Sequence, residues 1–247
     1  PRTKILLVLL YIIALFCARN AVSYGVLALT LAVCVRISGV GVRALVRGLK
    51  PVLFIIIFTG ILNLFFTPGT RNLVEWGPVH ISDTGLHNAV FMVLRIMLLI
   101  MGTFLMTYTT SPISLTDGLE RLLNGLKRFR VPVHELAMMM SIALRFIPTL
   151  IEETDKIMSA QKARGADFES GSLIQKAKAL VPVLVPLFIS ALRRADELAT
   201  AMECRCYHGG EGRTKLRVLQ YERRDYAALA LGVLILAGVV VLGWFGL

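Results

Sequence analysis

The sequence predicts an all-α integral membrane protein with about five membrane helices and three long amphipathic helices on the cytosolic side. First, 56% of the 247 residues are hydrophobic and the mean hydropathy is +0.71, both above the values of ordinary soluble domains. Second, several apolar runs approach the roughly 20 residues that a membrane helix needs. Third, charged residues make up only 17% of the chain, and 18 of the 27 basic residues fall between residues 111 and 225.

Two apolar runs are long enough to cross a bilayer. Residues 226–245 contain no charge, and residues 87–110 contain one, at Arg95. An ionised side chain inside a membrane is costly, so we expect Arg95 to face the helix bundle or to extend toward the outer interface. Three shorter apolar runs complete the predicted set of five membrane helices: 5–17, 21–35 and 51–66.

The distribution of basic residues predicts the orientation in the cell membrane. The linker 36–50 holds four basic residues, whereas the linker 67–86 holds only Arg71. Because cytoplasmic loops carry the excess of lysine and arginine, we expect the N-terminus inside, the loop 67–86 outside, residues 111–225 inside and the C-terminus outside. Proline–glycine turn signals in the loop 67–86 predict a small hairpin or a folded loop.

The chain therefore divides into N-terminal membrane helices (1–110), a cytosolic-face region (111–225) and a C-terminal membrane helix (226–247). Turn and cap signals split the middle region into three helices, and the second and third are each about 45 Å long at 1.5 Å per residue. Their apolar content predicts that they lie across the inner membrane face and extend their polar ends into the cytosol. The predicted helices run over about 114–130, 132–164 and 172–205.

Each long helix ends at an arginine between small residues. The first end reads Ala163-Arg164-Gly165 and the second reads Cys204-Arg205-Cys206, exactly 41 residues later. The arginine fork has five donors and a permanent charge, so each end is a candidate to enter a groove on a soluble partner. The residues alone leave a plainer alternative open, in which each arginine complements the helix dipole or binds anionic lipid.

These features together resemble the transmembrane T component of energy-coupling factor (ECF) transporters, which import vitamins and transition-metal ions. The resemblance covers nearly the whole chain, and the first motif matches as Ala163-Arg164-Gly165. The second motif departs, because Cys204 and Cys206 flank Arg205 where the family usually has alanine and glycine. The resemblance implies a non-catalytic subunit of an ATP-powered importer.

The resemblance also implies the partners. Two cytosolic ABC-type ATPases, which bind the ATP and magnesium, would receive the helix ends at Arg164 and Arg205. A membrane-embedded S component would bind a vitamin or other micronutrient and pack on the long helices. Methionine side chains repack readily against varied partners. The expected contact surface is Met138, Met139, Met140, Leu184 and Phe188.

Other functions remain as alternatives. Cys204, Cys206 and His208 are residue types that bind zinc, so an intramembrane metal-dependent enzyme is the second hypothesis and a passive lipid-binding scaffold is the third. We nevertheless expect no metal and no cofactor in this chain. The sequence lacks a phosphate-binding loop of the Gly-x-x-x-x-Gly-Lys-Ser/Thr type. Its positive charge follows a membrane pattern, so nucleic acid is not an expected partner.

Overall fold

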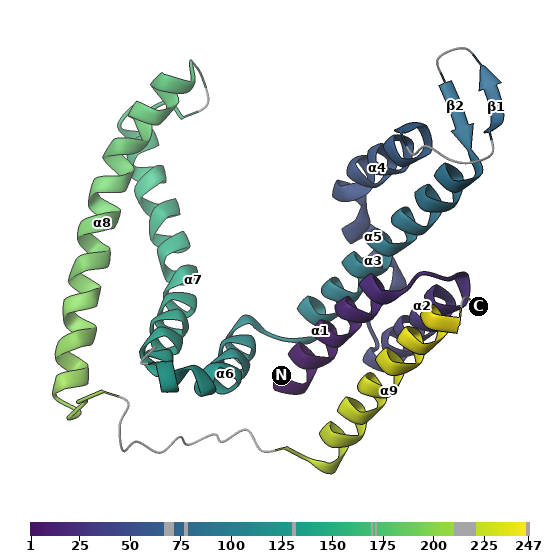
Figure 1. Ribbon diagram of the computed structural model, residues 1–247. Coiled ribbons are helices and arrows are strands. Elements are labelled where there is room, and N and C mark those ends of the chain that lie inside the picture. Colours follow the sequence, from purple (N-terminus) through teal and green to yellow (C-terminus); the bar gives the residue numbers. More distant parts are fainter. Residues whose placement is uncertain are drawn as a thin grey trace. The chain divides into compact units, whose positions relative to one another are not determined.

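The structure is a computed structural model that describes residues 1–66, 72–76, 79–129, 132–168, 170, 172–209 and 221–245 (Figure 1). The described chain is helical except for one β-hairpin, which confirms the predicted all-α membrane class. Contacts divide it into two compact units, Pro1–Gly118 with Leu219–Leu247 and Leu119–Val218. Each unit is described by itself below.

The first unit packs its helices around α5. Helix α1 contacts both α5 and α9, and α4 lies along α5. Helix α1, with 16 residues, falls short of membrane length, and α3 and α4 reach that length only as one continuous segment, Val42–Phe65. The elements of this unit are α1 (Arg2–Cys17), α2 (Ala21–Ser38), α3 (Val42–Leu49), a 3-10 turn (Lys50–Val52), α4 (Leu53–Phe66), β1 (Asn72–Trp76), β2 (Val79–Ser82), α5 (Asp83–Thr109) and α9 (Arg223–Phe245).

A small antiparallel hairpin, β1–β2, occupies the predicted outer loop. Asn72 pairs with Ser82 and Trp76 with Val79, with a register shift between Asn72 and Val74. The predicted hairpin is therefore confirmed, and the helix after it begins at Asp83 rather than at residue 87. The turn signal Gly77-Pro78 lies outside the described residues.

Glycines allow α1 to approach its neighbours closely. A methyl group at Gly102 of α5 would lie 2.8 Å from Cε1 of Tyr11, and one at Gly232 of α9 would lie 2.7 Å from Cδ2 of Leu7. Small residues at such contacts let membrane helices gain dispersion energy by close packing, since lipid provides no hydrophobic drive for their association. These contacts adjoin a buried core that includes Leu15 and Leu27.

Arg95 of α5 faces the helix bundle, which was one of the two positions expected for it; the other was the outer membrane interface. Its Nε donates to Tyr24 Oη at 2.8 Å, and its Nη2 donates to the Ala18 carbonyl at 3.1 Å. The guanidinium also lies over the Phe16 and Tyr24 rings. Ala18 is the extended residue that ends α1, so its carbonyl is released from the helix ladder and available to Arg95. One cation thus ties α5 to the α1–α2 connection.

The second unit contains the helices predicted for the cytosolic face. Helix α6 (Pro112–Leu123) straddles the border of the two units and is followed by a 3-10 helix (Asn124–Phe129). It begins two residues earlier than expected, because Ser111 accepts the Ser114 amide and Pro112 starts the first turn. Helices α7 (Val133–Ala163) and α8 (Leu173–Glu203) each have 31 residues. Their bounds agree closely with the predicted 132–164 and 172–205.

Local signals explain where α7 and α8 begin. Ser172 Oγ accepts the Gln175 amide, and the Gln175 side chain accepts the Ser172 amide at 2.9 Å, which forms a complete capping box on α8. On α7, Pro132 precedes the first turn, and His134 Nδ1 contacts Glu120 Oε1 of α6 at 3.0 Å. Both helices therefore have defined N-terminal ends.

Length and composition alone would let α7 and α8 cross a membrane. Six helical segments of the described chain meet that standard, and these two are among them. Many of their apolar side chains are exposed, which agrees with the expectation that they pack on lipid or on another protein. The six segments are Ala21–Ser38, Val42–Phe65, Gly85–Thr109, Val133–Ala163, Ile174–Glu203 and Arg223–Trp244.

Candidate docking site at two helix tips

The first candidate tip is the C-terminal end of α7. Arg164 is the cap residue, and its amide donates to the Gln161 carbonyl at 3.0 Å. Gly165 follows in the left-handed region with φ +88° and donates to Lys162 at 2.9 Å, while Ala166 donates to Gln161 at 3.0 Å. This pattern is a Schellman motif, in which a left-handed residue closes the helix and satisfies its last carbonyls.

The second tip, at the end of α8, has the same backbone geometry. The Arg205 amide donates to Met202 at 3.1 Å, Cys206 to Glu203 at 2.8 Å, and Tyr207 to Met202 at 3.1 Å. Each bond matches one at the first tip after a shift of 41 residues. Cys206 occupies the Gly165 position and also adopts positive φ, at 56°. The departure from glycine in the second motif therefore changes the side chain and leaves the fold of the cap unaltered.

The equivalence extends back into both helices. Ser159 Oγ donates to the Asp155 carbonyl at 2.7 Å, and Thr200 Oγ1 donates to the Asp196 carbonyl at 2.9 Å. These pairs also differ by 41 residues. The weak sequence repeat is thus a repeat of three-dimensional structure through the last two turns of each helix.

Both tips are exposed. The six tip residues are exposed, and among the described residues neither arginine guanidinium has a hydrogen-bond or ion-pair partner. In Figure 1, α7 and α8 run in opposite directions, so the two tips lie at opposite ends of the helix pair. An arginine guanidinium between small neighbours at each end can enter a groove on a partner and bind carboxylate or carbonyl groups there. The six are Ala163, Arg164, Gly165, Cys204, Arg205 and Cys206.

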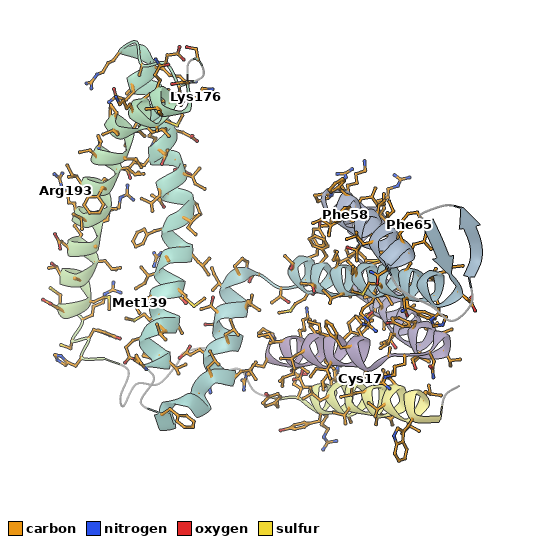
Figure 2. All side chains as sticks on the ribbon, turned by 45° about the horizontal axis from the view of Figure 1, so that its top comes forward. Cys17, Phe58, Phe65, Met139, Lys176 and Arg193 are labelled. Atoms are coloured by element: carbon orange, nitrogen blue, oxygen red, sulfur yellow. The ribbon has the colours of Figure 1, made fainter. Side chains whose placement is uncertain are left out.

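The predicted apolar contact surface is also accessible. On α7, Met139 is 56% exposed and Met140 is 48% exposed, whereas Met138 is half-buried. On α8, Leu184 is 57% exposed and Phe188 is 65% exposed. Figure 2 shows side chains projecting along the full length of both helices, with Met139 labelled on α7 and Arg193 on α8. Apolar side chains at these exposures need lipid or protein to cover them.

The cysteines and the histidine near the second tip do not form a metal site in the described structure. Cys204, Cys206 and His208 are exposed, and no group of three or more ligand-type side chains is positioned to hold an ion among the residues described.

Two contacts between α7 and α8 were not expected from the sequence. Arg194 Nη2 donates to Glu153 Oε2 at 2.6 Å, and Gln161 Nε2 donates to the Pro182 carbonyl at 3.4 Å. Glu153 and Arg194 differ by 41 residues, but α7 and α8 run in opposite directions, so a fixed sequence offset is met at only one point along the pair and did not predict this contact. The free Pro182 carbonyl could have been predicted from the sequence, because Pro186 has no N–H to donate to the carbonyl four residues earlier.

Comparisons with known proteins match most or nearly all of the chain. A family model described as CbiQ, cobalt transport protein, matches residues 1–216. An energy-coupling factor transporter transmembrane protein EcfT from Ruminiclostridium cellulolyticum is 51% identical over 98% of this chain and 90% of its own length. Proteins of the same name from Thermosediminibacter oceani and Bacillus subtilis are 52% and 47% identical, each over 97% of this chain and at least 90% of their own lengths.

Matches of this extent and identity concern the whole arrangement of membrane helices and long amphipathic helices, rather than one motif. The chain therefore belongs to the CbiQ family of cobalt transport proteins and, within it, to the transmembrane T components of energy-coupling factor transporters.

Proposed function

We propose that this multi-pass membrane protein couples two cytosolic ABC-type ATPases to a membrane-embedded S component and so drives uptake of a vitamin or other micronutrient. The observation that carries the proposal is the pair of equivalent, exposed tips at Arg164 and Arg205. Two matched surfaces at opposite ends of one helix pair suit two similar partners. In this proposal the chain hydrolyses no ATP itself, and the ATPases bind the nucleotide and magnesium.

The proposed mechanism transmits the motion of the ATPases through α7 and α8. ATP binding draws the two ATPases together, and the arginine tips move with them. The 31-residue helices α7 and α8 carry that displacement along roughly 45 Å, at 1.5 Å per residue, to their apolar surfaces. The S component packs on that surface through Met139, Met140 and Phe188 and changes orientation in response. A ligand shifts such an equilibrium only through different contacts in the two states, and the anchored tips supply them.

The proposed orientation follows from the basic residues. The tips must lie in the cytosol to reach ATPases, which agrees with an N-terminus inside, a cytosolic α6–α8 region and a C-terminus outside. The β1–β2 hairpin then lies outside the cell. The apolar faces of α7 and α8 rest against the inner side of the bilayer or against the S component.

The test is co-purification with the two ATPases after co-expression. Arg164→Glu or Arg205→Glu should each weaken the complex by on the order of 2–5 kcal/mol, because the reversed charge meets a groove built for a cation. The double variant should lose the complex or uncouple hydrolysis from uptake. Lys156→Glu on α7 and Arg193→Glu on α8 are the matched controls, since both side chains are exposed and lie away from the tips.

The alternatives predict different results. A passive lipid scaffold tolerates both tip reversals and recruits no ATPase. A metal-dependent enzyme binds zinc stoichiometrically as a purified single chain and loses activity with Cys204→Ser rather than with Arg164→Glu. Uptake and assembly that survive the double reversal would refute the docking proposal.

A further inference from the structure

The two contacts between α7 and α8 join parts of the molecule that the proposed function moves. The Glu153–Arg194 ion pair joins the middle parts of the helices, and the Gln161–Pro182 hydrogen bond joins the α7 tip to α8. Gln161 also accepts the amides of Arg164 and Ala166 through its carbonyl. A shift of α8 at Pro182 therefore acts on Gln161, whose carbonyl accepts two of the amides at the first tip.

The ion pair is well suited to fix one helix against the other. Its N–O distance of 2.6 Å is short even for a charge-assisted hydrogen bond, and the side chains are only 34% and 22% exposed. Partial burial reduces screening by water and salt, so the attraction exceeds that of a fully exposed pair. In an exact repeat, positions 153 and 194 would carry the same residue and like charges would repel. The two repeats instead carry opposite charges at these equivalent positions, so the contact is attractive.

Apolar packing on one side of the ion pair is loose. A groove of about 260 Å³ separates the helices there, lined by Ile142, Phe146 and Leu150 of α7 and by Ala191, Leu198 and Met202 of α8. Close-packed interfaces have few voids of this size. The polar contacts therefore add a restraint on a side where the apolar side chains do not interlock.

The proline chemistry explains the second contact. Pro186 lacks an N–H, so the Pro182 carbonyl loses its usual helical donor. Gln161 Nε2 lies 3.4 Å from this carbonyl, near the upper limit for a hydrogen bond. The contact is exposed, so water can replace Gln161 on this carbonyl and the long bond costs little to break and re-form. This contact is thus a weaker, adjustable restraint beside the stronger ion pair.

We propose that Glu153, Arg194 and Gln161 are positioning residues that set the separation of the two arginine tips and keep it coupled to motion of α7 against α8. The proposal rests on the proposed docking function. None of the three residues needs to touch an ATPase. They act through α7 and α8, by holding the helices in the relation that presents both tips at once.

The first experiment measures the distance between the tips by pulsed electron paramagnetic resonance on the assembled transporter in lipid nanodiscs. Spin labels go on Ala160→Cys and Ala201→Cys, exposed positions that correspond through the 41-residue offset. The background replaces Cys17, Cys34 and Cys204 by alanine and Cys206 by glycine, which gives the second tip the motif of the first. This background is checked for uptake before labelling.

Glu153→Gln or Arg194→Gln should broaden the distance distribution and shift its mean. Uptake per ATP hydrolysed should fall about fivefold, the low end of coupling between sites in proteins. The charge exchange Glu153→Arg with Arg194→Glu should restore both readouts, which a purely local packing defect would not allow. Gln161→Leu should broaden the distribution less. Glu152→Gln and Arg193→Gln are the controls, since each neighbours one partner, is exposed and lies outside the pair.

The outcomes separate this proposal from the docking proposal. If Glu153→Gln and Arg194→Gln give the same tip distances and the same uptake per ATP as the control variants, the positioning role is overturned. A changed distance with an unchanged uptake-to-hydrolysis ratio also overturns it, because the tips would then move without consequence. Tolerance of Arg164→Glu and Arg205→Glu in the assembly assay refutes docking instead, and that assay does not depend on the distances.

Discussion

Gly165 and Cys206 close their helices with the same hydrogen bonds, yet one is glycine and the other carries a side chain. Their φ angles are +88° and +56°, and Cys206 is the only non-glycine residue with positive φ in the described part of the chain. A side chain in the left-handed region costs roughly 1–2 kcal/mol, and such strain persists where the surrounding structure imposes it. The second tip therefore stores strain that the first does not.

Cys206→Gly should stabilise the protein. The change removes the left-handed strain and keeps both cap hydrogen bonds, so we expect a gain of about 1 kcal/mol in unfolding free energy. Thermal unfolding of the purified protein in detergent measures it. Cys204→Gly is the control, because Cys204 has φ −59° in the right-handed region and glycine there adds only flexibility. Equal effects of the two changes would show that Cys206 is not strained.

Gly165→Ala should have the opposite effect. Nothing lies within 4 Å of the added methyl group, so the cost is that of the backbone conformation alone, about 1–2 kcal/mol. We expect the last turn of α7 to fray and ATPase binding to weaken with it, as measured by thermal unfolding and co-purification. Gly125→Ala, also with free space around it and without positive φ, should not lower stability and should leave ATPase binding unchanged. If Gly165→Ala left the complex with the ATPases unaffected, docking would not depend on the conformation of the cap.

Arg95→Leu should destabilise the membrane unit. The change removes the donors to Tyr24 Oη and to the Ala18 carbonyl and leaves two polar groups without partners, at roughly 1–3 kcal/mol each. Tyr24→Phe removes only one of these bonds and should cost less. Arg95→Lys keeps the charge without the planar fork and should fall between them. Thermal unfolding in detergent ranks the three, and a neutral Arg95→Leu would contradict a structural role for this cation.

Sequence reasoning reached the long helices because their signals are local. Ser172 begins α8 and Gly165 ends α7, and both conformations depend on residue type within a turn. The same reasoning missed the left-handed conformation of Cys206, since cysteine carries no preference for it. It also placed the start of α6 too late, because the Ser111-Pro112 signal was passed over in favour of later hydroxyls.

Contacts between distant residues could be predicted less well. Arg95 was recognised as costly in an apolar run, but its partners Tyr24 and Ala18 come from helices whose packing no local pattern fixes. The Glu153–Arg194 pair was missed for the same reason, because the register between two antiparallel helices depends on how they pack and not on a local pattern.

Glycine-to-alanine changes should distinguish close helix contacts from open positions within the membrane unit. Gly102→Ala places a methyl group 2.8 Å from the rigid Tyr11 ring and should cost about 1–3 kcal/mol, while Gly232→Ala meets the flexible end of Leu7 at 2.7 Å and should cost less. Gly238→Ala, on the same helix with nothing within 4 Å, should instead stabilise by about 0.5–1 kcal/mol, because alanine is the better helix former. Thermal unfolding of the three variants in one detergent gives the order. A loss of stability in Gly238→Ala equal to that in Gly102→Ala would mean that α1 does not pack against α5 and α9 as described.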